Sequence, residues 1–320
     1  MQRRHLLAVA LAPLALPSWA QDWPTQPVHI VVPTGPGSSL DLIARALGDK
    51  LAARWGQAVV IDNKPGAGGL LGMDIAAKAT DGHTVAIGFN GPIAFAPFLY
   101  RKMPYDPAKD LKPIVMLTSQ PNVLAVNAAK VPARTVAEFV AWAKAQKGRV
   151  NYSSLGNGSS AHLTMELFKS VAGFDATHIP FNGSPPAAMA LAQGEVDCSF
   201  MVEPALLPFV RNNKVRLLAV SSAQRPASLK DLPTLAESGY PAVESLAWNG
   251  LFAPASMPDA VAAKINADAN TALRDPALHQ AFQAQGLSIV GGSAGDFGRV
   301  IAADVTRWGP VIRKIGITLD

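Results

Sequence analysis

The chain has 320 residues, 49% of them hydrophobic, and a formal net charge of +5. This is enough apolar material for one large or two medium domains. Its basic residues do not cluster with interleaved aromatic side chains, so a nucleic-acid partner is not expected. Cys198 is the sole cysteine, which rules out an internal disulfide, and its apolar surroundings predict a buried, inert thiol.

The N-terminus predicts an exported protein. Arg3 and Arg4 precede an apolar stretch over residues 6–16, and Ser18-Trp19-Ala20 is a small-x-small cleavage site, so residues 1–20 are interpreted as a signal peptide cleaved near Ala20. The apolar stretch is about half the ~20 residues that a spanning helix needs. We therefore expect a periplasmic protein, with Sec and twin-arginine export both open.

Short apolar strands then alternate with helical patterns, which is typical of the α/β class. In the first helix, Leu40, Ile43, Leu47 and Leu51 share one face, and Gly56 supplies the stop. The pattern predicts strands over residues 28–32, 58–61 and 84–89, and helices over residues 40–55 and 70–79.

A second lobe is expected to follow. Its predicted strands cover residues 123–126, 150–153, 177–181, 196–201 and 215–220, and its helices cover residues 135–147 and 161–172. An apolar segment at 246–253 leads to two amphipathic helical patterns, at 259–285 and 296–315. These last two helices are expected to cover the first lobe.

Two glycine-rich turns lie between a strand and a helix. The first is Thr34 to Ser39 and the second is Ser154 to Ser160. Such turns direct the free backbone N–H groups and the positive dipole end of a helix at one point, an arrangement that binds anions.

The second turn also matches a dinucleotide-binding fingerprint. Gly156 to Ala161 fits G-x-G-x-x-G/A, and Asp175 follows at the expected distance. In a true fingerprint, however, the acidic residue ends the second strand, whereas Asp175 precedes the strand predicted at 177–181. A nicotinamide cofactor is therefore not expected.

The sequence gives little support for a metal site or for a hydrolase. The histidines at positions 29, 83, 162, 178 and 279 follow no metal-binding spacing, so no metal or other cofactor is predicted. No G-x-S-x-G elbow occurs, and Ser159 is interpreted as a helix cap. An exported hydrolase remains the alternative, because Asp197 and Glu203 could act as an acid/base pair if they met in a cleft.

A series of short motifs in a fixed order resembles one protein family. These motifs are Trp23-Pro24 leading to Ile30-Val31-Val32-Pro33, Asn63 to Gly69, Leu99-Tyr100 with Met103 to Pro107, Asn151-Tyr152 through Gly156 and Gly158 to His162-Leu163, Glu166 to Phe168, His178 to Phe181, Gly194 to Asp197, Arg216 to Val220, Leu232 to Thr234 with Glu237 to Gly239, and Trp248 to Pro254. Over nearly the whole mature chain, the sequence resembles the substrate-binding proteins of tripartite tricarboxylate transporters, the Bug-type periplasmic receptors related to TctC.

The resemblance implies a two-lobed clamshell of periplasmic binding protein type II with two crossing strands as hinge. Lobe 1 would comprise residues 21–122 and 254–320, and lobe 2 residues 123–253. The hinge strands would lie near residues 118–127 and 246–254. Backbone donors and helix dipoles, without an arginine clamp, would hold a carboxylate between the lobes.

The resemblance also implies ligand-binding residues in both turns and on the floor beside them. Many members have aromatic-Pro-Pro-Gly-Gly in the first turn, where this chain has Thr34 to Ser38, so its pocket is expected to be more polar. Members that bind amino acids have an Asp at the position of Met201, which disfavours a simple amino acid. The expected ligand-binding residues are Thr34, Gly35, Gly37, Ser38, Ser39, Ala67, Gly68, Asn90, Ser154, Gly156, Asn157, Gly158, Ser159, Met201 and Glu203.

The function implied is capture without catalysis. A monomeric receptor would take up a small organic anion, a carboxylate, close around it, and dock on the membrane permease subunits of the transporter. A ligand-sensing receptor on the same scaffold is a further alternative.

Overall fold

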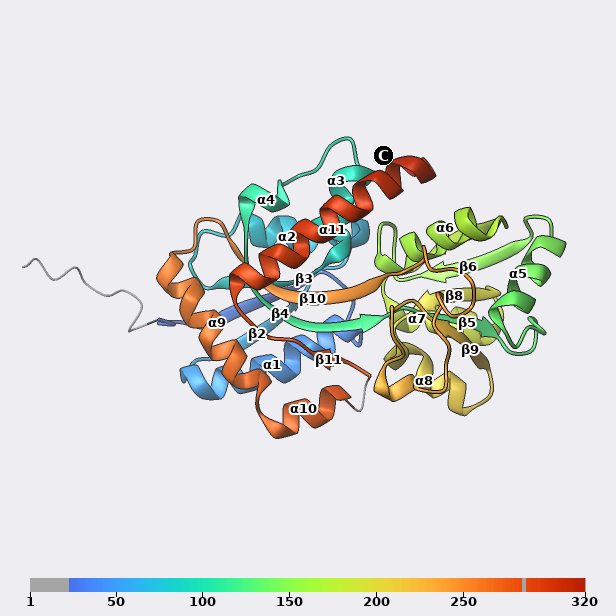
Figure 1. Ribbon diagram of the computed structural model, residues 1–320. Coiled ribbons are helices and arrows are strands. Elements are labelled where there is room, and N and C mark those ends of the chain that lie inside the picture. The colour runs from blue at the N-terminus through green and yellow to red at the C-terminus, as the bar shows by residue number, and fades with distance from the viewer. Residues whose placement is uncertain (1–22, 284–285, 320) are drawn as a thin grey trace, which may run out of the picture.

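The computed structural model describes residues 23–283 and 286–319. Figure 1 shows two lobes side by side, each built on one β-sheet with helices around it. The α/β class expected from the sequence is confirmed. The predicted signal peptide, residues 1–20, lies outside the described residues. None of the helices described is long and apolar enough to cross a membrane.

The larger sheet has six strands in the order β11-β4-β10-β3-β1-β2. The strands β1, β2 and β3 run parallel to one another, and β10 is antiparallel to both β3 and β4. These strands are β1 (Val28–Val32), β2 (Val59–Asn63), β3 (Thr84–Phe89), β4 (Leu111–Pro121), β10 (Leu246–Pro254) and β11 (Ser288–Ile289).

Helices cover both faces of this sheet because its strands are apolar on both sides. Leu47 of α1, Ile265 of α9 and Phe282 of α10 share one core cluster. Met73 of α2 and Trp308 of α11 belong to the cluster on the other face. The helical elements of this lobe are α1 (Ser39–Trp55), η1 (Ala67–Gly69), α2 (Leu70–Ala77), η2 (Gly91–Phe95), α3 (Ala96–Leu99), α4 (Pro107–Asp110), α9 (Asp259–Leu273), α10 (Pro276–Gln283) and α11 (Ala294–Ile315).

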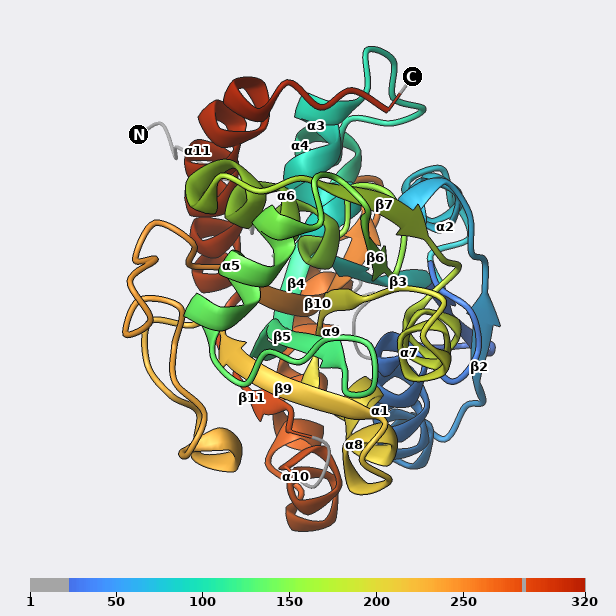
Figure 2. The ribbon, with the colours of Figure 1, turned by 90° about the vertical axis from the view of Figure 1, so that its right-hand side faces the viewer.

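The smaller sheet has five strands in the order β7-β6-β8-β5-β9, and Figure 2 views the molecule from this lobe. The strands β7, β6 and β8 are parallel, whereas β5 is antiparallel to β8 and β9. The elements are β5 (Val123–Asn127), α5 (Val136–Ala145), β6 (Val150–Ser154), α6 (Ser160–Ala172), β7 (Ala176–Pro180), α7 (Ser184–Gln193), β8 (Cys198–Met201), α8 (Glu203–Arg211), β9 (Val215–Val220) and η3 (Ala227–Leu229).

The chain passes between the two sheets at neighbouring points. It leaves β4 for β5 at Asn122 and returns into β10 after Ser245. The two crossings are joined by hydrogen bonds, because Ser221 donates its N–H to Asn122 O and accepts from Asn122 N, and Ser245 N donates to Ser221 O. Two adjacent segments, joined to each other by hydrogen bonds through Ser221, therefore connect the lobes.

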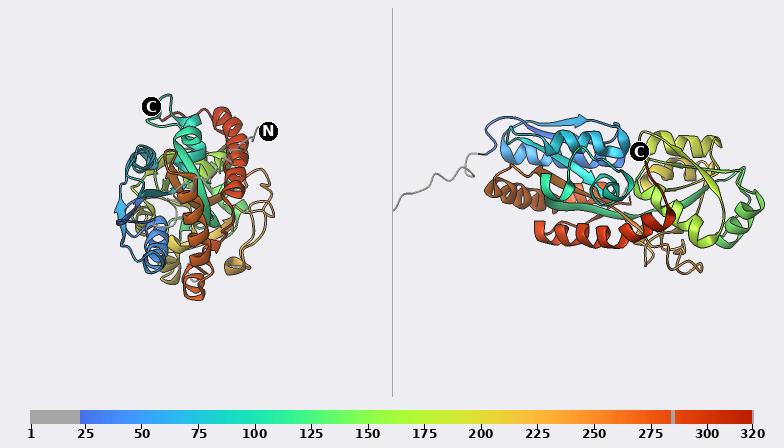
Figure 3. Two further views of the ribbon diagram at one scale, coloured as in Figure 1. Left: turned by 90° about the vertical axis from the view of Figure 1, so that its left-hand side faces the viewer. Right: turned by 90° about the horizontal axis from the view of Figure 1, so that it is seen from above.

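The C-terminal helix α11 also joins the lobes. It runs along the larger lobe towards the smaller one (Figure 3, right). Leu163 of α6 belongs to the same core cluster as Trp308 and Ile312 of α11. The smaller lobe thus has an apolar contact with a helix that covers the larger sheet.

The structure corrects the predicted element list at a few places. The helix expected over residues 259–285 is two helices, α9 and α10. The break occurs because Asp275 accepts hydrogen bonds from Ala277 N and Leu278 N and so caps α10, which begins at Pro276. Residues 284–285 lie outside the described ranges. Most of β4 (Leu111–Pro121) and the helices α7 and α8 were not predicted. Pro113 and Pro121 of β4 obscured a strand signal, because proline lacks a ladder N–H.

Candidate functional site

The first turn, residues 34–39, is held by side chains of the helix that follows it. Ser38 caps α1, accepting from Asp41 N at 3.3 Å, and its Oγ lies 2.6 Å from Thr34 Oγ1. Gly37 N donates to Asp41 Oδ2 over 2.9 Å. Asn63 on β2 donates to Thr34 O over 3.1 Å. The turn is thus fixed from both sides.

A buried charged group supports this turn. Asp41 is 2% exposed and pairs with Arg45 at 3.0 Å. Burial alone would raise the pKa of Asp41, but the hydrogen bonds from Arg45 and Gly37 N outweigh burial, and the pKa lies below its usual value. The carboxylate therefore stays ionised beneath the turn.

The second turn, residues 154–160, has the same cap but a different support. Ser159 caps α6, accepting from His162 N at 3.3 Å, and donates to Gly156 O over 2.7 Å. Gly158 N donates to His162 Nδ1 over 3.1 Å. Ser154 Oγ lies 2.7 Å from His178 Nε2. Two histidine rings take the place that Asp41 and Asn63 have in the first turn.

These histidines form an uncharged stack. The rings of His162 and His178 lie 4.0 Å apart, and Tyr152 stacks on His178 at 4.9 Å. Burial lowers the pKa of His162 to about 4 and that of His178 to about 3. Both rings are neutral at neutral pH, as the acceptor role of His162 Nδ1 requires.

Each turn approaches the backbone of the opposite lobe, the second turn at η1 and η2 and the first turn at Asn182 before α7. A Cβ built on Gly68 would lie 2.3 Å from Asn157 O, and one on Gly91 would lie 3.0 Å from Gly158 O. A Cβ on Gly35 would lie 3.3 Å from Asn182 O. The lobes are therefore close together here, and glycine allows the closest of these approaches.

Between the turns lies a cavity of about 30 Å³, here named the interlobe cavity. It has room for about two water molecules. The helices α1, α6 and α7 all begin at its wall, with Ser39, Ser160 and Ser184. Its lining residues are Thr34, Ser38, Ser39, Leu40, Phe89, Asn90, Gln120, Leu155, Ser160, Gly183, Ser184, Val202, Ala247, Trp248 and Asn249.

The electrostatics of this cavity come from the backbone. In the part of the chain that the structure describes, no Asp, Glu, Lys, Arg or His is among its lining residues. Each helix N-terminus carries the equivalent of roughly half a positive charge. Three such ends can offset the charge of one carboxylate without a basic side chain.

An adjoining cavity, also of about 30 Å³, shares Thr34, Phe89, Leu155 and Gly183 with the first. Gly68 and Gly156 line it from opposite lobes. Together the two cavities lie along the boundary between the lobes, and residues of both turns line them.

Apart from Met201 and Glu203, the expected ligand-binding residues fall into three groups. Thr34, Ser38, Ser39, Asn90, Gly68 and Gly156 line one of the two cavities. Gly35, Asn157 and Gly158 take part in the contacts between lobes. In the third group, Gly37 N donates to Asp41 in α1, Ser154 and Ser159 form hydrogen bonds within their own turn, and Ala67 begins η1.

Met201 and Glu203 are not among the lining residues of either cavity. The Met201 side chain is fully buried in a core cluster with Val123 and Leu206. Glu203 accepts a hydrogen bond from Ser228 and lies beside Gly286. Asp197 accepts from Asn151 N, so the described hydrogen bonds of Asp197 and Glu203 lead to different parts of the lobe.

Sequence reasoning missed a third turn and the hinge-strand residues. Gly183 and Ser184 open α7, with Pro185 in its first turn, which is the usual signal for a helix start after a strand. Gln120 and Asn249 lie on β4 and β10. Their strands were expected to be hinges, but which side chains point inward depends on register, which the sequence does not reveal.

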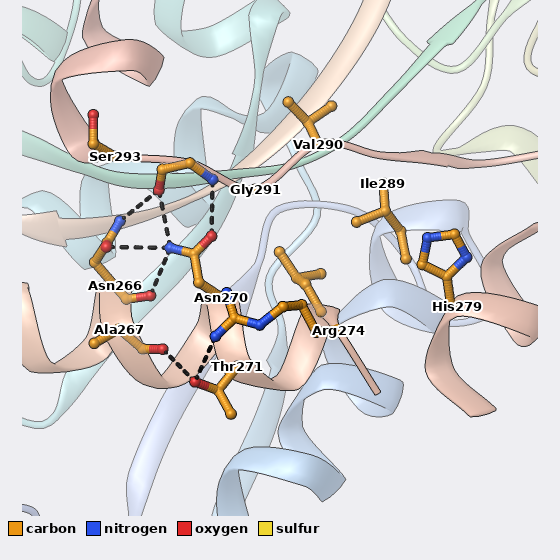
Figure 4. A pocket seen from close by; sticks show the side chains of 12 residues that line it. Asn266, Ala267, Asn270, Thr271, Arg274, His279, Ile289, Val290, Gly291 and Ser293 are labelled. Carbon is orange, nitrogen blue, oxygen red and sulfur yellow. Dashed lines mark hydrogen bonds between the residues drawn. The ribbon is translucent and has the colours of Figure 1, made fainter. Parts of the chain in front are cut away.

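A much larger groove, of about 1020 Å³, lies away from the lobe boundary, between α9, α10 and β11 (Figure 4). Its polar side chains bond mainly to neighbouring backbone. Asn266 and Asn270 both donate to Gly292 O, and Asn270 Oδ1 accepts from Gly292 N. These amides hold the chain that leads into α11. Within the described residues, no group of three His, Cys, Asp or Glu side chains could hold a metal ion.

Comparison with known proteins identifies the family. The model of the tripartite tricarboxylate transporter family receptor matches residues 43–317. The chain belongs to this family. Protein BugT of Bordetella pertussis (strain Tohama I) is 35% identical over 326 residues, covering 100% of both chains.

Solved structures agree with this receptor assignment. The structure of R. palustris Rpa4515 with adipate is 34% identical, has a TM-score of 0.88, and covers 93% of this chain and 99% of that one. MatC (Rpa3494) from Rhodopseudomonas palustris with bound malate is 30% identical, has a TM-score of 0.86, and covers 91% of this chain and 100% of that one. The predicted family and the two-lobed periplasmic binding protein fold are confirmed.

Proposed function

We propose that this receptor captures a small organic carboxylate between its lobes and delivers it to the membrane permease subunits of a tripartite tricarboxylate transporter. The observation that carries the proposal is the meeting of three helix N-termini at an uncharged cavity between the lobes. Two similar structures were solved with carboxylates, one with adipate and the other with bound malate. The receptor acts as a periplasmic monomer without catalysis, after cleavage near Ala20.

Capture needs the lobes to separate and close. A cavity of about 30 Å³ is far below the roughly 300–1,000 Å³ that is usual for a ligand pocket. We propose lobes of residues 21–122 with 254–320 and of residues 123–253, moving about strands near 118–127 and 246–254. The hydrogen-bonded crossings at Asn122, Ser221 and Ser245 support this hinge. A ligand favours closure only through contacts that improve in the closed form.

A thermal-shift panel with calorimetry tests the proposal. Residues 21–320 are unfolded and refolded to remove carried ligand, then mixed with mono-, di- and tricarboxylates, amino acids and NAD. The expected result is a saturable rise in melting temperature with one class of carboxylate, at one ligand per chain. A shift with NAD alone, or consumption of a compound, would contradict it and favour an exported enzyme.

A further inference from the structure

The contact between α6 and α11 is apolar and belongs to both lobes. Leu163 of α6 is 0% exposed and shares a core cluster with Trp308 and Ile312 of α11. Leu167, one turn further along α6, packs against this cluster and also against a core cluster of the smaller lobe. This part of α6 is therefore held between the two lobes.

Hydrogen bonds attach the same part of α6 to the two segments that cross between the lobes. Thr164 is 0% exposed, and its Oγ1 lies 2.6 Å from Ser160 O and 2.8 Å from Ser245 Oγ. Asn122 Nδ2 donates to Thr164 Oγ1 over 3.4 Å. Ser160 lines the interlobe cavity, whereas Asn122 and Ser245 lie at the crossings. Thr164 thus joins a helix start at the cavity to both crossings.

The helix α7 is attached differently. Leu191 of α7 is 0% exposed, and all the described residues of its core cluster lie between residues 123 and 232, within the smaller lobe. The turn before α7 meets the larger lobe through backbone, because a Cβ built on Gly35 would lie 3.3 Å from Asn182 O. Asn182 is exposed, and Gly183 lines both cavities. The lobe boundary on this side is therefore polar and incompletely filled.

The two sides differ in what their separation would cost. Parting α6 from α11 would expose Leu163 and Trp308, and this cost grows with the apolar area that meets water. Parting Asn182 from Gly35 would expose polar backbone, with which water can form hydrogen bonds. Figures 1 and 2 show α6 and α11 in the upper part of the molecule and α7 and α1 in the lower part. Separation on the α7 side is therefore the less costly motion.

We propose that the receptor opens by rotation about the contact between α6 and α11, so that the lobes part on the α7 side. This contact persists in the open and the closed forms and acts with the two crossings as the pivot. On the basis of the function proposed above, the carboxylate enters and leaves between Gly35 of the first turn and Asn182 before α7.

Distances between spin labels on the refolded, ligand-free mature chain test the inference. Cysteines at exposed positions carry the labels, with Leu42→Cys on α1 paired with Met189→Cys on α7, and Ala303→Cys on α11 paired with Ser170→Cys on α6. Double electron–electron resonance is expected to show a spread of α1–α7 distances that is wider than that of the α6–α11 distances by more than about 2 Å. Spreads that differ by less than this, or a wider spread for the α6–α11 pair, would overturn the inference.

The same four positions supply the control for the labels themselves. Paired within one lobe, as Leu42→Cys with Ala303→Cys and as Ser170→Cys with Met189→Cys, they report the spread that the labels contribute without any motion between lobes. Cys198 is 0% exposed and should take no label in the folded chain. The protein without introduced cysteines checks this.

Variants identify the contact that acts as the pivot. Thr164→Val removes the hydroxyl and keeps the shape of the side chain, and Leu163→Ala removes the apolar contact. Each is expected to widen the spread of the α6–α11 distances by more than about 2 Å. The matched controls are Thr271→Val, which loses an exposed hydrogen bond to Ala267 O, and Leu191→Ala, which leaves a gap within the smaller lobe. Both controls should keep the wild-type spread. A wild-type spread in both Thr164→Val and Leu163→Ala would overturn the assignment of the pivot.

The failures can be told apart because the distances are measured without a ligand. If carboxylates bind at one per chain but the two pairs of labels have equal spreads, the receptor function stands and only the inference fails. If no carboxylate raises the melting temperature, the proposed function fails and the entry route fails with it, whatever the distances show.

Discussion

The first and second turns perform the same task with different supports. Each starts a helix with a serine cap, Ser38 or Ser159. Behind the first is an ionised carboxylate, Asp41, paired with Arg45. Behind the second are the neutral rings of His162 and His178. The same backbone geometry can therefore be held by a charged side chain or by neutral side chains. The dependence of stability on pH should distinguish these two kinds of support.

The largest expected difference between the two turns is in how their supporting side chains make the unfolding free energy depend on pH. His162 has a pKa of about 4 in the folded chain, against about 6.5 when unfolded. Between these values the unfolded chain binds a proton that the folded chain does not, so stability falls as pH decreases from about 6.5 to about 4. The loss from His162 alone is on the order of 3 kcal/mol. Denaturant unfolding at several pH values measures it.

The matched variant is His162→Asn, whose amide oxygen can accept from Gly158 N but does not titrate. Its stability should fall less steeply over the same pH range, by up to about 1.4 kcal/mol per pH unit. Asp41 has a lowered pKa, so its contribution is retained until the pH falls below about 4. Identical slopes in the variant and the wild type would show that the histidine stack does not set the pH dependence.

The next effect concerns the contact between the lobes. In Gly68→Ala, the new Cβ would meet Asn157 O at 2.3 Å. Overpacking of this kind costs about 1–3 kcal/mol, so ligand affinity should fall about ten- to a hundredfold in calorimetry. Gly82→Ala is the control, because Gly82 has φ +68 against +64 for Gly68 but its Cβ would meet nothing within 4 Å. Equal losses of affinity in both variants would mean that the strain of a positive φ, and not the contact with Asn157 O, causes the effect.

Removing the charge of Asp41, which supports the first turn, is expected to cost less stability than the pH effect of His162. Asp41→Asn removes a buried carboxylate that accepts from Gly37 N and Arg45, and should lower the unfolding free energy by about 2 kcal/mol at pH 7. The control is Asp259→Asn in the first turn of α9, where the side chain is 94% exposed. That change should stay within about 1 kcal/mol. A larger loss for Asp259 would argue against burial as the cause.

The smallest effect should be the same in both turns. Ser38→Ala and Ser159→Ala each remove a helix cap, which is worth about 1 kcal/mol. Thermal unfolding of the two variants should give shifts of similar size. A shift in only one of them would mean that the turns differ in their caps as well as in their supports.

The sequence predicted local features better than the packing between elements. The strands at 28–32, 84–89 and 215–220 have the predicted bounds, since apolar runs ending in turn residues define them locally. The helix over 259–285 was wrong at Asp275, where a cap breaks a continuous apolar pattern. The stacking of His162 on His178 joins α6 to β7, and no spacing rule indicates such a contact.

The candidate site shows the same limit. Both turns could be identified from their glycines and serines because a strand, a turn and a helix start follow one another in the chain. Gln120 could not, because its place at the cavity depends on the register between β4 and β10, in which it pairs with Ala247.

The measurement that tests the central claim most directly is a crystal structure of the refolded mature chain with a carboxylate that raises its melting temperature. The prediction is that the carboxylate lies between the lobes, within hydrogen-bond distance of backbone N–H groups at the starts of α1, α6 and α7. A carboxylate bound in the groove between α9, α10 and β11, with the cavity between the lobes unchanged, would contradict the account.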